Sequence, residues 1–333
     1  MAPSIWHRCA AIALVLITAV CAAADPAARV LPVKDGKKAA FLIQFDDAHA
    51  SQVPVVIPAL RERKLVGTFY VFNRTEQLLD RAEAWKQAAK EGVVTFGNHT
   101  FSHKHIHNSF PDADTCASEL TQCNELIRSL TPDQPWPRLI AYARPGGTKP
   151  ASPGIGDAGT RPILERLHLV TRPDFRGAGI HVKTRADMLA VVDRAVAQGG
   201  MGHLDFHGVG KASGINVATD DFLAFLDHVV ANREALWVTD CISWHAYETE
   251  RKDAAVSVVR SAAQEVALAL ACGADKAFYR QPLTLEWTLP AGWTRCRATQ
   301  DGAELTVEIS AGAARFSAVP NAGEIVLRPA NGS

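Results

Sequence analysis

The chain has 333 residues, carries 35 basic and 35 acidic side chains, and is 47% hydrophobic. This length is more than one hydrophobic core ordinarily fills, so it predicts one large domain and a smaller one. Because the charges balance and form no long run of one sign, the composition argues against a nucleic-acid-binding protein.

The first 24 residues have the pattern of a signal peptide. A basic start is followed by an uncharged run from Cys9 to Ala24, which ends in three alanines. This run is short and alanine-rich for a membrane span of about 20 residues. An uncleaved anchor and a lipid on Cys21 are the alternatives. We expect an exported protein, periplasmic or secreted, with no stable membrane span after cleavage.

The cysteines beyond this segment are too few and too scattered for a disulfide framework. They are Cys116, Cys123, Cys241, Cys272 and Cys296. If Cys116 and Cys123 lay on one helix they would be about 10 Å apart, which no disulfide can span. A bridge between these two therefore requires a helix that starts after Cys116.

From residue 38 to about 250, short apolar segments alternate with longer amphipathic or alanine-rich segments. The expected strands are residues 39–45, 67–72, 93–97, 139–143, 167–171, 203–207 and 236–240. The expected helices are residues 53–64, 76–91, 115–130, 184–198, 220–232 and 242–251. This alternation predicts parallel strands with helical crossovers, either in a barrel or in an open doubly wound sheet.

After Asp253 the pattern changes to short alternating segments separated by Gly, Pro and Asn. This change predicts a small antiparallel β module over residues 253–333. Residues 254–271 also fit a helix, because alanine-rich runs suit both periods, but we favour strands. Trp287 and Trp293 could stack on sugars, although packing within the module is the favoured role.

Polar residues follow several of the expected strands. Asp46 and Asp47 follow the first strand, His99 the third, Arg144 the fourth, and His207 the sixth. Because the carboxyl ends of parallel strands meet on one face, we expect these side chains to gather in one site.

His99 and His103 stand four residues apart in HTFSH. On a helical turn, both imidazoles would face one metal ion, and an added Asp would complete three protein ligands with one position open for water, as in catalytic zinc sites. Adjacent acids at the end of a strand point in different directions, so one of Asp46 and Asp47 can bind the ion while the other faces the water. The alternative for this pair is an N-cap of the following helix.

Four segments, QFDDAH, HTFSH, ARPGG and LDFHG, together resemble the motifs of the NodB-type polysaccharide deacetylases, TFDDG, H(S/T)xxH, RxPxG and LxH. The resemblance covers residues 38 to about 250. It implies a distorted (β/α)7 barrel of NodB type, with the small β module after it in the chain. The expected organisation is a signal peptide over residues 1–24, a catalytic domain over 25–252, and a β-sandwich-like module over 253–333.

The resemblance also implies a role for each site residue. Asp46 would be the general base and His207 the general acid, while Arg144 would hold Asp46. The metal ligands would be Asp47, His99 and His103. The ion would be divalent, zinc first, with cobalt, nickel and manganese as alternatives.

Three departures from the family pattern bear on the site. The third motif reads RPGG, and Ala48 stands where the family has Gly. We expect the neighbouring His49 to pack or face solvent rather than line the site. The family's Asp and Trp pair, which orients the acid histidine, has no clear counterpart, and Asp174 is the nearest candidate.

The function expected from these residues is hydrolysis of N-acetyl groups on an envelope or extracellular glycan. The substrate partner would be an acetylated oligo- or polysaccharide. An O-acetyl esterase acting on xylan or a similar glycan is the first alternative, and an inactive glycan-binding protein is an alternative of another class. The intact acidic and histidine residues argue against the inactive protein.

Overall fold

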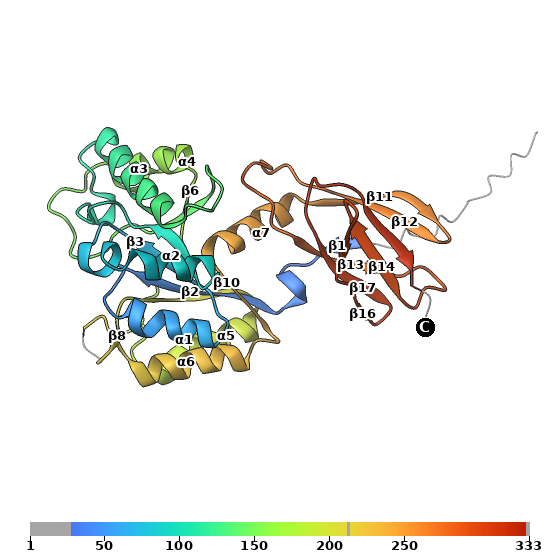
Figure 1. The fold of residues 1–333 in the computed structure, drawn as a ribbon, viewed down its shortest axis with the longest axis horizontal. Helices are drawn as coiled ribbons and strands as arrows, with labels where there is room; N and C mark the ends of the chain where they lie inside the picture. The colour runs from blue at the N-terminus through green and yellow to red at the C-terminus, as the bar shows by residue number, and fades with distance from the viewer. Residues whose placement is uncertain (1–27, 212–213, 331–333) are drawn as a thin grey trace, which may run out of the picture.

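A computed structural model describes residues 28–211 and 214–330 of the chain, so the predicted signal peptide lies outside the described residues. The chain folds into two parts, and helix α7 leads from one to the other (Figure 1). Each part has its own cluster of buried hydrophobic side chains.

All seven expected strands are present, and they pair in parallel within one sheet. They are β2 (Ala39–Asp46), β3 (Gly67–Val71), β4 (Val94–Asn98), β5 (Ile140–Tyr142), β6 (Leu169–Thr171), β7 (Gly200–Phe206) and β10 (Leu236–Thr239). Strand β7 pairs with residues 39–45 of β2, whereas β10 pairs with residues 39–42 and β3 with residues 44–46. The sheet curls, and residues 176–178 after β6 hydrogen-bond to Asp205 of β7. The predicted α/β fold with a distorted barrel is confirmed in this form.

Helices cover the outer face of this sheet. Those that match the expected segments are α1 (Ile57–Glu62), α2 (Ala82–Lys90), α3 (Ala113–Leu130), α5 (Arg185–Gln198), α6 (Thr219–Ala231) and α7 (Cys241–Asp253), with short helical turns at Gln52–Val56 and Thr75–Leu79 before α1 and α2. Helix α4 (Gly156–Arg166) was not predicted, because Pro162 and two glycines interrupt its helical pattern. Within the described ranges, no helix is long and apolar enough to cross a membrane.

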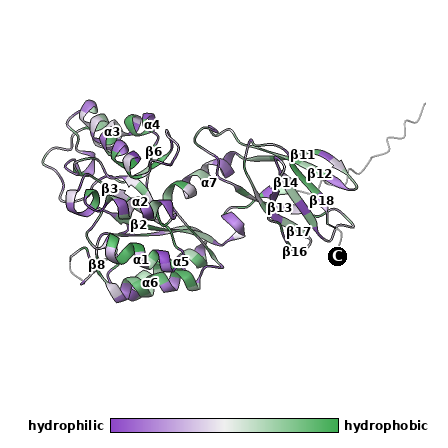
Figure 2. Ribbon diagram, viewed as in Figure 1, coloured by the Kyte–Doolittle hydropathy of each residue, from purple (hydrophilic) through white to green (hydrophobic). Residues whose placement is uncertain are grey.

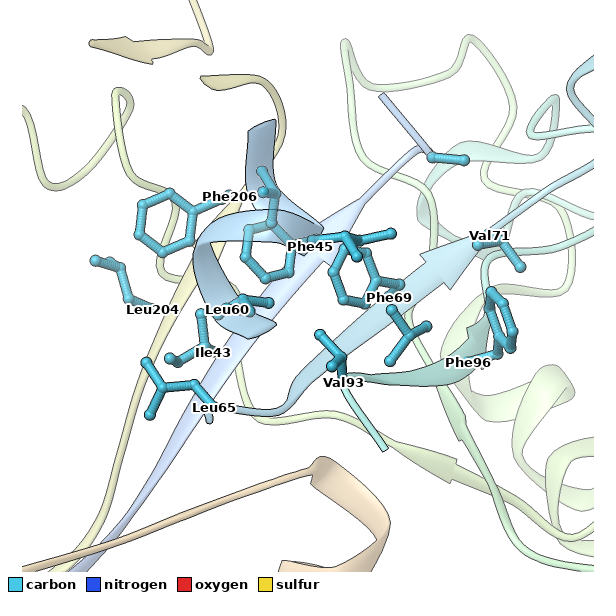
Figure 3. Close-up of a cluster of buried hydrophobic side chains, with 14 of the residues drawn as sticks. Ile43, Phe45, Leu60, Leu65, Phe69, Val71, Val93, Phe96, Leu204 and Phe206 are labelled. Carbon is cyan, nitrogen blue, oxygen red and sulfur yellow. The ribbon is translucent and has the colours of Figure 1, made fainter. Parts of the chain in front are cut away.

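The alternation along β2 separates two environments. Ile43 and Phe45 point toward the helices, where they pack with Phe69, Phe206 and Leu60 (Figure 3). Side chains on the opposite face point into the curl of the sheet. This interior is apolar at Leu42 and becomes polar toward the carboxyl end of the strand, at residues 44 and 46. Hydrophobic and hydrophilic residues alternate along covering helices such as α6 (Figure 2).

The C-terminal part is a sandwich of two antiparallel sheets. One contains β1 (Ala28–Val30), β13 (Leu283–Thr288), β17 (Ala313–Ala318) and β16 (Glu308–Ser310), and the other contains β11 (Ala255–Ala262), β12 (Glu265–Ala271), β18 (Ile325–Pro329), β14 (Cys296–Gln300) and β15 (Ala303–Leu305). Residues 254–271 thus form strands, as favoured. Trp287 is fully buried, and Trp293 packs edge-on against it at 5.7 Å between ring centroids. Trp287 therefore packs the core rather than offering a surface to sugars.

The N-terminal strand β1 was not predicted. It pairs with β13 at the edge of the C-terminal sandwich, so residues 28–30 group with the second part and not with residues 39–250. A strand of three residues is too short to show an alternating pattern, which explains why the sequence did not reveal it. The predicted division at residues 252 and 253 falls where α7 ends and β11 begins, and it stays a prediction.

Helix α3 begins at Ala113, so Cys116 and Cys123 lie on one helix, and both are free and buried. By the condition set from the sequence, they do not form a bridge.

Glu250 of α7 is expected to make the stability of the folded protein depend on pH. Its side chain is buried, and Oε2 accepts a hydrogen bond from the backbone N–H of Gln281 at 2.9 Å. Burial raises the pKa of Glu250 to about 7, from 4.5. The folded protein therefore binds more protons than the unfolded chain between these two pH values, and the free energy of unfolding falls as pH rises through that window.

We expect Glu250→Gln to stabilise the protein at pH 8 by up to about 3 kcal/mol, and to have little effect near pH 4.5. Urea unfolding at the two pH values measures this difference. Glu234→Gln, at a carboxylate that is 98% exposed, is the control. An equal effect of Glu250→Gln at both pH values would count against the explanation.

Candidate active site

The carboxyl ends of the parallel strands bring five of the six predicted site residues together. Asp46 ends β2 and Asp47 follows it, His99 and His103 follow β4, and His207 follows β7. The sixth, Arg144 after β5, points elsewhere and is considered below.

Asp47, His99 and His103 could together hold a metal ion. Asp47 Oδ1 lies 3.4 Å from His99 Nε2 and 3.1 Å from His103 Nε2. One ligand atom from each residue lies within 4.8 Å of the others. Asp47 Oδ1 is buried and has no hydrogen-bond partner among the residues that the structure describes. Two imidazole nitrogens facing such an oxygen fit a divalent cation.

The backbone fixes the tautomer of His99. Its Nδ1 lies 2.7 Å from the carbonyl oxygen of Ala143. A carbonyl only accepts, so Nδ1 carries the proton and Nε2 presents its lone pair toward Asp47. Metal-binding histidines commonly have this second hydrogen bond, because it orients the ring and makes the ligating nitrogen more basic.

The loop that carries the two histidines is not the expected helical turn. Thr100 and His103 have φ of 61° and 58°, which places them in the left-handed region. Glu119 of α3 holds the loop by accepting hydrogen bonds from the backbone N–H groups of Phe101 and Ser102, at 3.0 and 2.8 Å. The expectation of a helical turn was therefore wrong, although the two imidazoles still converge on Asp47. Left-handed φ values at non-glycine residues are often associated with functional sites.

The electrostatics of Asp47 and His103 favour a cation at this position. Burial alone would raise the pKa of Asp47, but the neighbouring imidazoles of His103 and His99 bring it well below its usual range. Burial would lower the pKa of His103, yet the carboxylate of Asp47 raises it. Asp47 is thus an ionised carboxylate that attracts positive charge to this position.

Asp46 is buried beside this site, and an arginine holds it. Arg172 Nη1 and Nη2 donate to Asp46 Oδ1 and Oδ2 at 2.7 and 3.0 Å, in the two-pronged geometry of a strong ion pair. Burial would raise the pKa of Asp46, but Arg172, together with His99 and His207, brings it below the ordinary value. Asp46 therefore remains a carboxylate at neutral pH.

Arg172 occupies the place that the family motifs predicted for Arg144. Arg144 instead pairs with Asp157 of α4 at 2.9 Å, and its side chain is half exposed. The prediction that Arg144 holds Asp46 is therefore corrected to Arg172. Arg172 directly follows β6, so its position at a strand end is a signal in the sequence that could have identified it. The prediction for this segment named only Asp174.

His207 faces both acidic residues. Its Nε2 lies 3.9 Å from Asp46 Oδ2 and 3.9 Å from Asp47 Oδ2, and the Phe175 ring packs edge-on against its imidazole. His207 Nδ1 is buried and has no hydrogen-bond partner in the described part of the chain. Asp174 contacts a different histidine, since its backbone carbonyl lies 2.8 Å from His203 Nε2.

His49 lies close to the site. A Cβ atom added to Gly208 would lie 2.6 Å from His49 Cε1, so His49 packs against the residue that follows His207. Burial and the positive charge of Arg74 lower the pKa of His49. Arg74 also donates to the backbone carbonyl of Asp47 at 2.9 Å. His49 therefore packs, as favoured, but does so at the edge of the site.

A carboxylate held by arginine, a second carboxylate facing two imidazoles and a nearby histidine make a site suited to metal-assisted hydrolysis. The sequence model of the polysaccharide deacetylase family matches residues 33–153. The matched residues contain the segments QFDDAH, HTFSH and ARPGG, and the match supports the resemblance to that family. No curated protein matches the chain.

Several solved structures are similar to part of this chain. The catalytic domain of a peptidoglycan N-acetylglucosamine deacetylase from Eubacterium rectale is 18% identical, with a TM-score of 0.45, over 66% of this chain and 93% of that one. Peptidoglycan deacetylase PdaC from Bacillus subtilis is 16% identical, with a TM-score of 0.44, over 64% and 92%. A pseudoenzyme of carbohydrate esterase family 4 from Bacillus anthracis is 14% identical, with a TM-score of 0.43, and the match spans 60% of this chain and 63% of that protein.

Proposed function

We propose that this protein is a metal-dependent hydrolase that removes N-acetyl groups from an envelope or extracellular glycan. The observation that carries the proposal is the convergence of Asp47, His99 and His103 beside the buried, arginine-held Asp46. The match of residues 33–153 to the polysaccharide deacetylase family supports the acetylated glycan as the substrate class.

Asp47 Oδ1, His99 Nε2 and His103 Nε2 would hold the ion. A divalent metal there, zinc first with cobalt, nickel and manganese as alternatives, would acidify a water molecule and polarise the acetyl carbonyl.

Asp46 and His207 are the residues that would transfer protons. Asp46 is a carboxylate at neutral pH, so it can accept a proton from the attacking water. Arg172 keeps that carboxylate in place. His207 faces the same centre and can donate the proton that the leaving amine takes up as the carbon–nitrogen bond breaks.

An O-acetyl esterase is the second candidate, and His207 supports it. No carboxylate contacts His207 Nδ1 in the described part of the chain, so the acid receives less support than a histidine paired with a carboxylate. An alkoxide leaves more easily than an amine and requires less help from an acid. An acetylated xylan therefore remains a reasonable substrate class.

Acetate release from an N-acetylated oligosaccharide and from acetylated xylan distinguishes the two chemistries. The proposal expects faster release from the N-acetylated substrate, and loss of release on chelation. Faster release from xylan would select the esterase. No release from any acetylated glycan by fully metallated protein would favour the glycan-binding alternative.

The cellular location is also a proposal. We infer export to the periplasm or the medium from the pattern of residues 1–24, which lie outside the described residues. Mass spectrometry of the protein made in an exporting host should find a new N-terminus near Asp25. An intact Met1 on the exported protein would contradict cleavage.

The finding that Arg172, and not Arg144, pairs with Asp46 leads to a specific prediction. Arg144→Ala is expected to change kcat by less than about threefold, because Arg144 pairs with a surface carboxylate and not with Asp46. Arg172→Ala is expected to lower kcat by 100-fold or more, about 3 kcal/mol, because it leaves Asp46 without its ion-pair partner. The reverse order of effects in acetate-release kinetics would restore the role first given to Arg144.

A further inference from the structure

The guanidinium of Arg172 lies between two buried carboxylates. Besides its two bonds to Asp46, Arg172 Nη1 donates to Asp205 Oδ1 at 3.3 Å. The side chains of Arg172, Asp46 and Asp205 are 8%, 4% and 0% exposed. We propose that Asp205 is a positioning residue, which acts with Arg172 as one unit to hold the base Asp46. This inference rests on the proposed function.

Within the described ranges, every hydrogen-bond partner of the Asp205 carboxylate donates to it. Gln44 Nε2 reaches Oδ1 at 2.9 Å, and the backbone N–H of Arg176 reaches Oδ2 at 2.6 Å. Tyr70 fixes the orientation of Gln44, because the Tyr70 hydroxyl donates to Gln44 Oε1 at 2.6 Å. Burial raises the pKa of Asp205, while the charges of Arg172 and His203 oppose that rise. An ionised carboxylate accepts only, so this set of donors fits the charged form of Asp205.

Asp205 links Arg172 to the strand that carries the base. In the parallel ladder between β7 and β2, Asp205 is the register partner of Gln44, two residues before Asp46. Arg172 itself lies in the segment after β6, between the rings of Tyr70 and Phe175, with its Cζ 4.9 and 5.1 Å from the ring centroids. Asp205 therefore fixes the guanidinium against a rigid strand, and the guanidinium then fixes Asp46.

The pairing of Arg172 with Asp205 explains two departures from the family motifs. In the LxH motif a leucine stands two residues before the histidine, and here Asp205 stands two residues before His207. In the RxPxG motif the arginine is Arg144, which pairs with Asp157 at the surface. The arginine that holds Asp46 here follows β6 instead of β5, and its side chain is buried in the interior of the sheet. A carboxylate at position 205 gives this buried guanidinium a second partner of opposite charge.

The first test compares Asp205→Asn with wild type. We expect unchanged metal content, a KM within about threefold and a kcat at least tenfold lower, because the substituted residue changes how Asp46 is held and not how substrate binds. Asp193→Asn, at a surface carboxylate that pairs with His228, is the matched control. A kcat of Asp205→Asn within twofold of wild type would overturn the proposal.

Guanidinium rescue tests whether the two residues form a unit. Added guanidinium at millimolar concentration is expected to restore part of the activity of Arg172→Ala and to raise its Tm, because Asp46 and Asp205 both line the vacated position. The double variant Arg172→Ala, Asp205→Asn should show neither effect, and urea at equal concentration should not replace guanidinium. If guanidinium rescued Arg172→Ala and the double variant equally, Arg172 and Asp205 would not act as one unit.

The Tm measurement also separates this inference from the proposed function. If wild-type protein releases no acetate, the proposed function fails, while the guanidinium-dependent rise in Tm still tests the unit. If Arg172→Ala does not fold, Arg172→Lys replaces it. Lysine keeps the charge but cannot make the two-pronged contact, so its kcat should fall at least tenfold and should fall little further when Asp205→Asn is added. If Arg172→Lys and Asp205→Asn instead lowered kcat by independent factors that multiply, the two residues would not act as one unit.

Discussion

Asp46→Asn is expected to keep the metal and lower kcat by 100- to 10,000-fold, the range typical of the loss of a general base. Asparagine has the shape of aspartate but cannot take a proton from water. The substitution should not disrupt the interior, because Arg172 keeps its contact with Asp205. Metal content by elemental analysis and acetate release measure the two expectations.

A surface aspartate provides the control for this variant. Asp227→Asn removes a carboxylate that is 64% exposed and pairs with Arg63, so it should leave both metal content and kcat unchanged. If Asp46→Asn loses the metal as well, Asp46 is a ligand and not a base. If it keeps both the metal and its turnover, the proton acceptor is another group.

His103→Ala is expected to weaken metal binding by more than about 100-fold, because even indirect support of a metal ligand is worth 10- to 100-fold in affinity. His103 is the cleaner choice of the two histidines, since its side chain is 26% exposed whereas His99 is buried. Calorimetric titration of metal-free protein with zinc measures the change.

The same loop offers a matched control. His105 is two residues along the chain, and its Nε2 lies 4.0 Å from Glu119 rather than near Asp47. His105→Ala should retain zinc affinity within about threefold. If His103→Ala and His105→Ala weaken zinc binding equally, the ion is held by the histidine-rich loop as a whole and not by the three converging residues.

The strands of the parallel sheet could be located from the sequence, because each is a buried apolar run bounded by turns. Asp46, Asp47, His99, His103 and His207 could likewise be placed at strand ends, which the structure brings together. Parallel strands all present their carboxyl ends on one face, so a residue at such an end can be assigned to the site without knowledge of its neighbours.

The partners of these residues were harder to predict. Which arginine reaches Asp46 depends on how the segments after β5 and β6 turn, and local patterns do not encode that turn. Asp205 was hidden for a related reason, because nothing in its strand indicated that Arg172 would be buried against it. The left-handed residues in HTFSH could not be predicted from helical spacing either.

The most direct test of the proposed mechanism is acetate release by wild-type protein from an N-acetylated oligosaccharide, measured before chelation, after chelation and after zinc is restored. We predict release by the untreated protein, no release after chelation, and recovery on addition of about one equivalent of zinc. Release that persists after the metal has been removed would contradict the central claim that Asp47, His99 and His103 hold the ion on which hydrolysis depends.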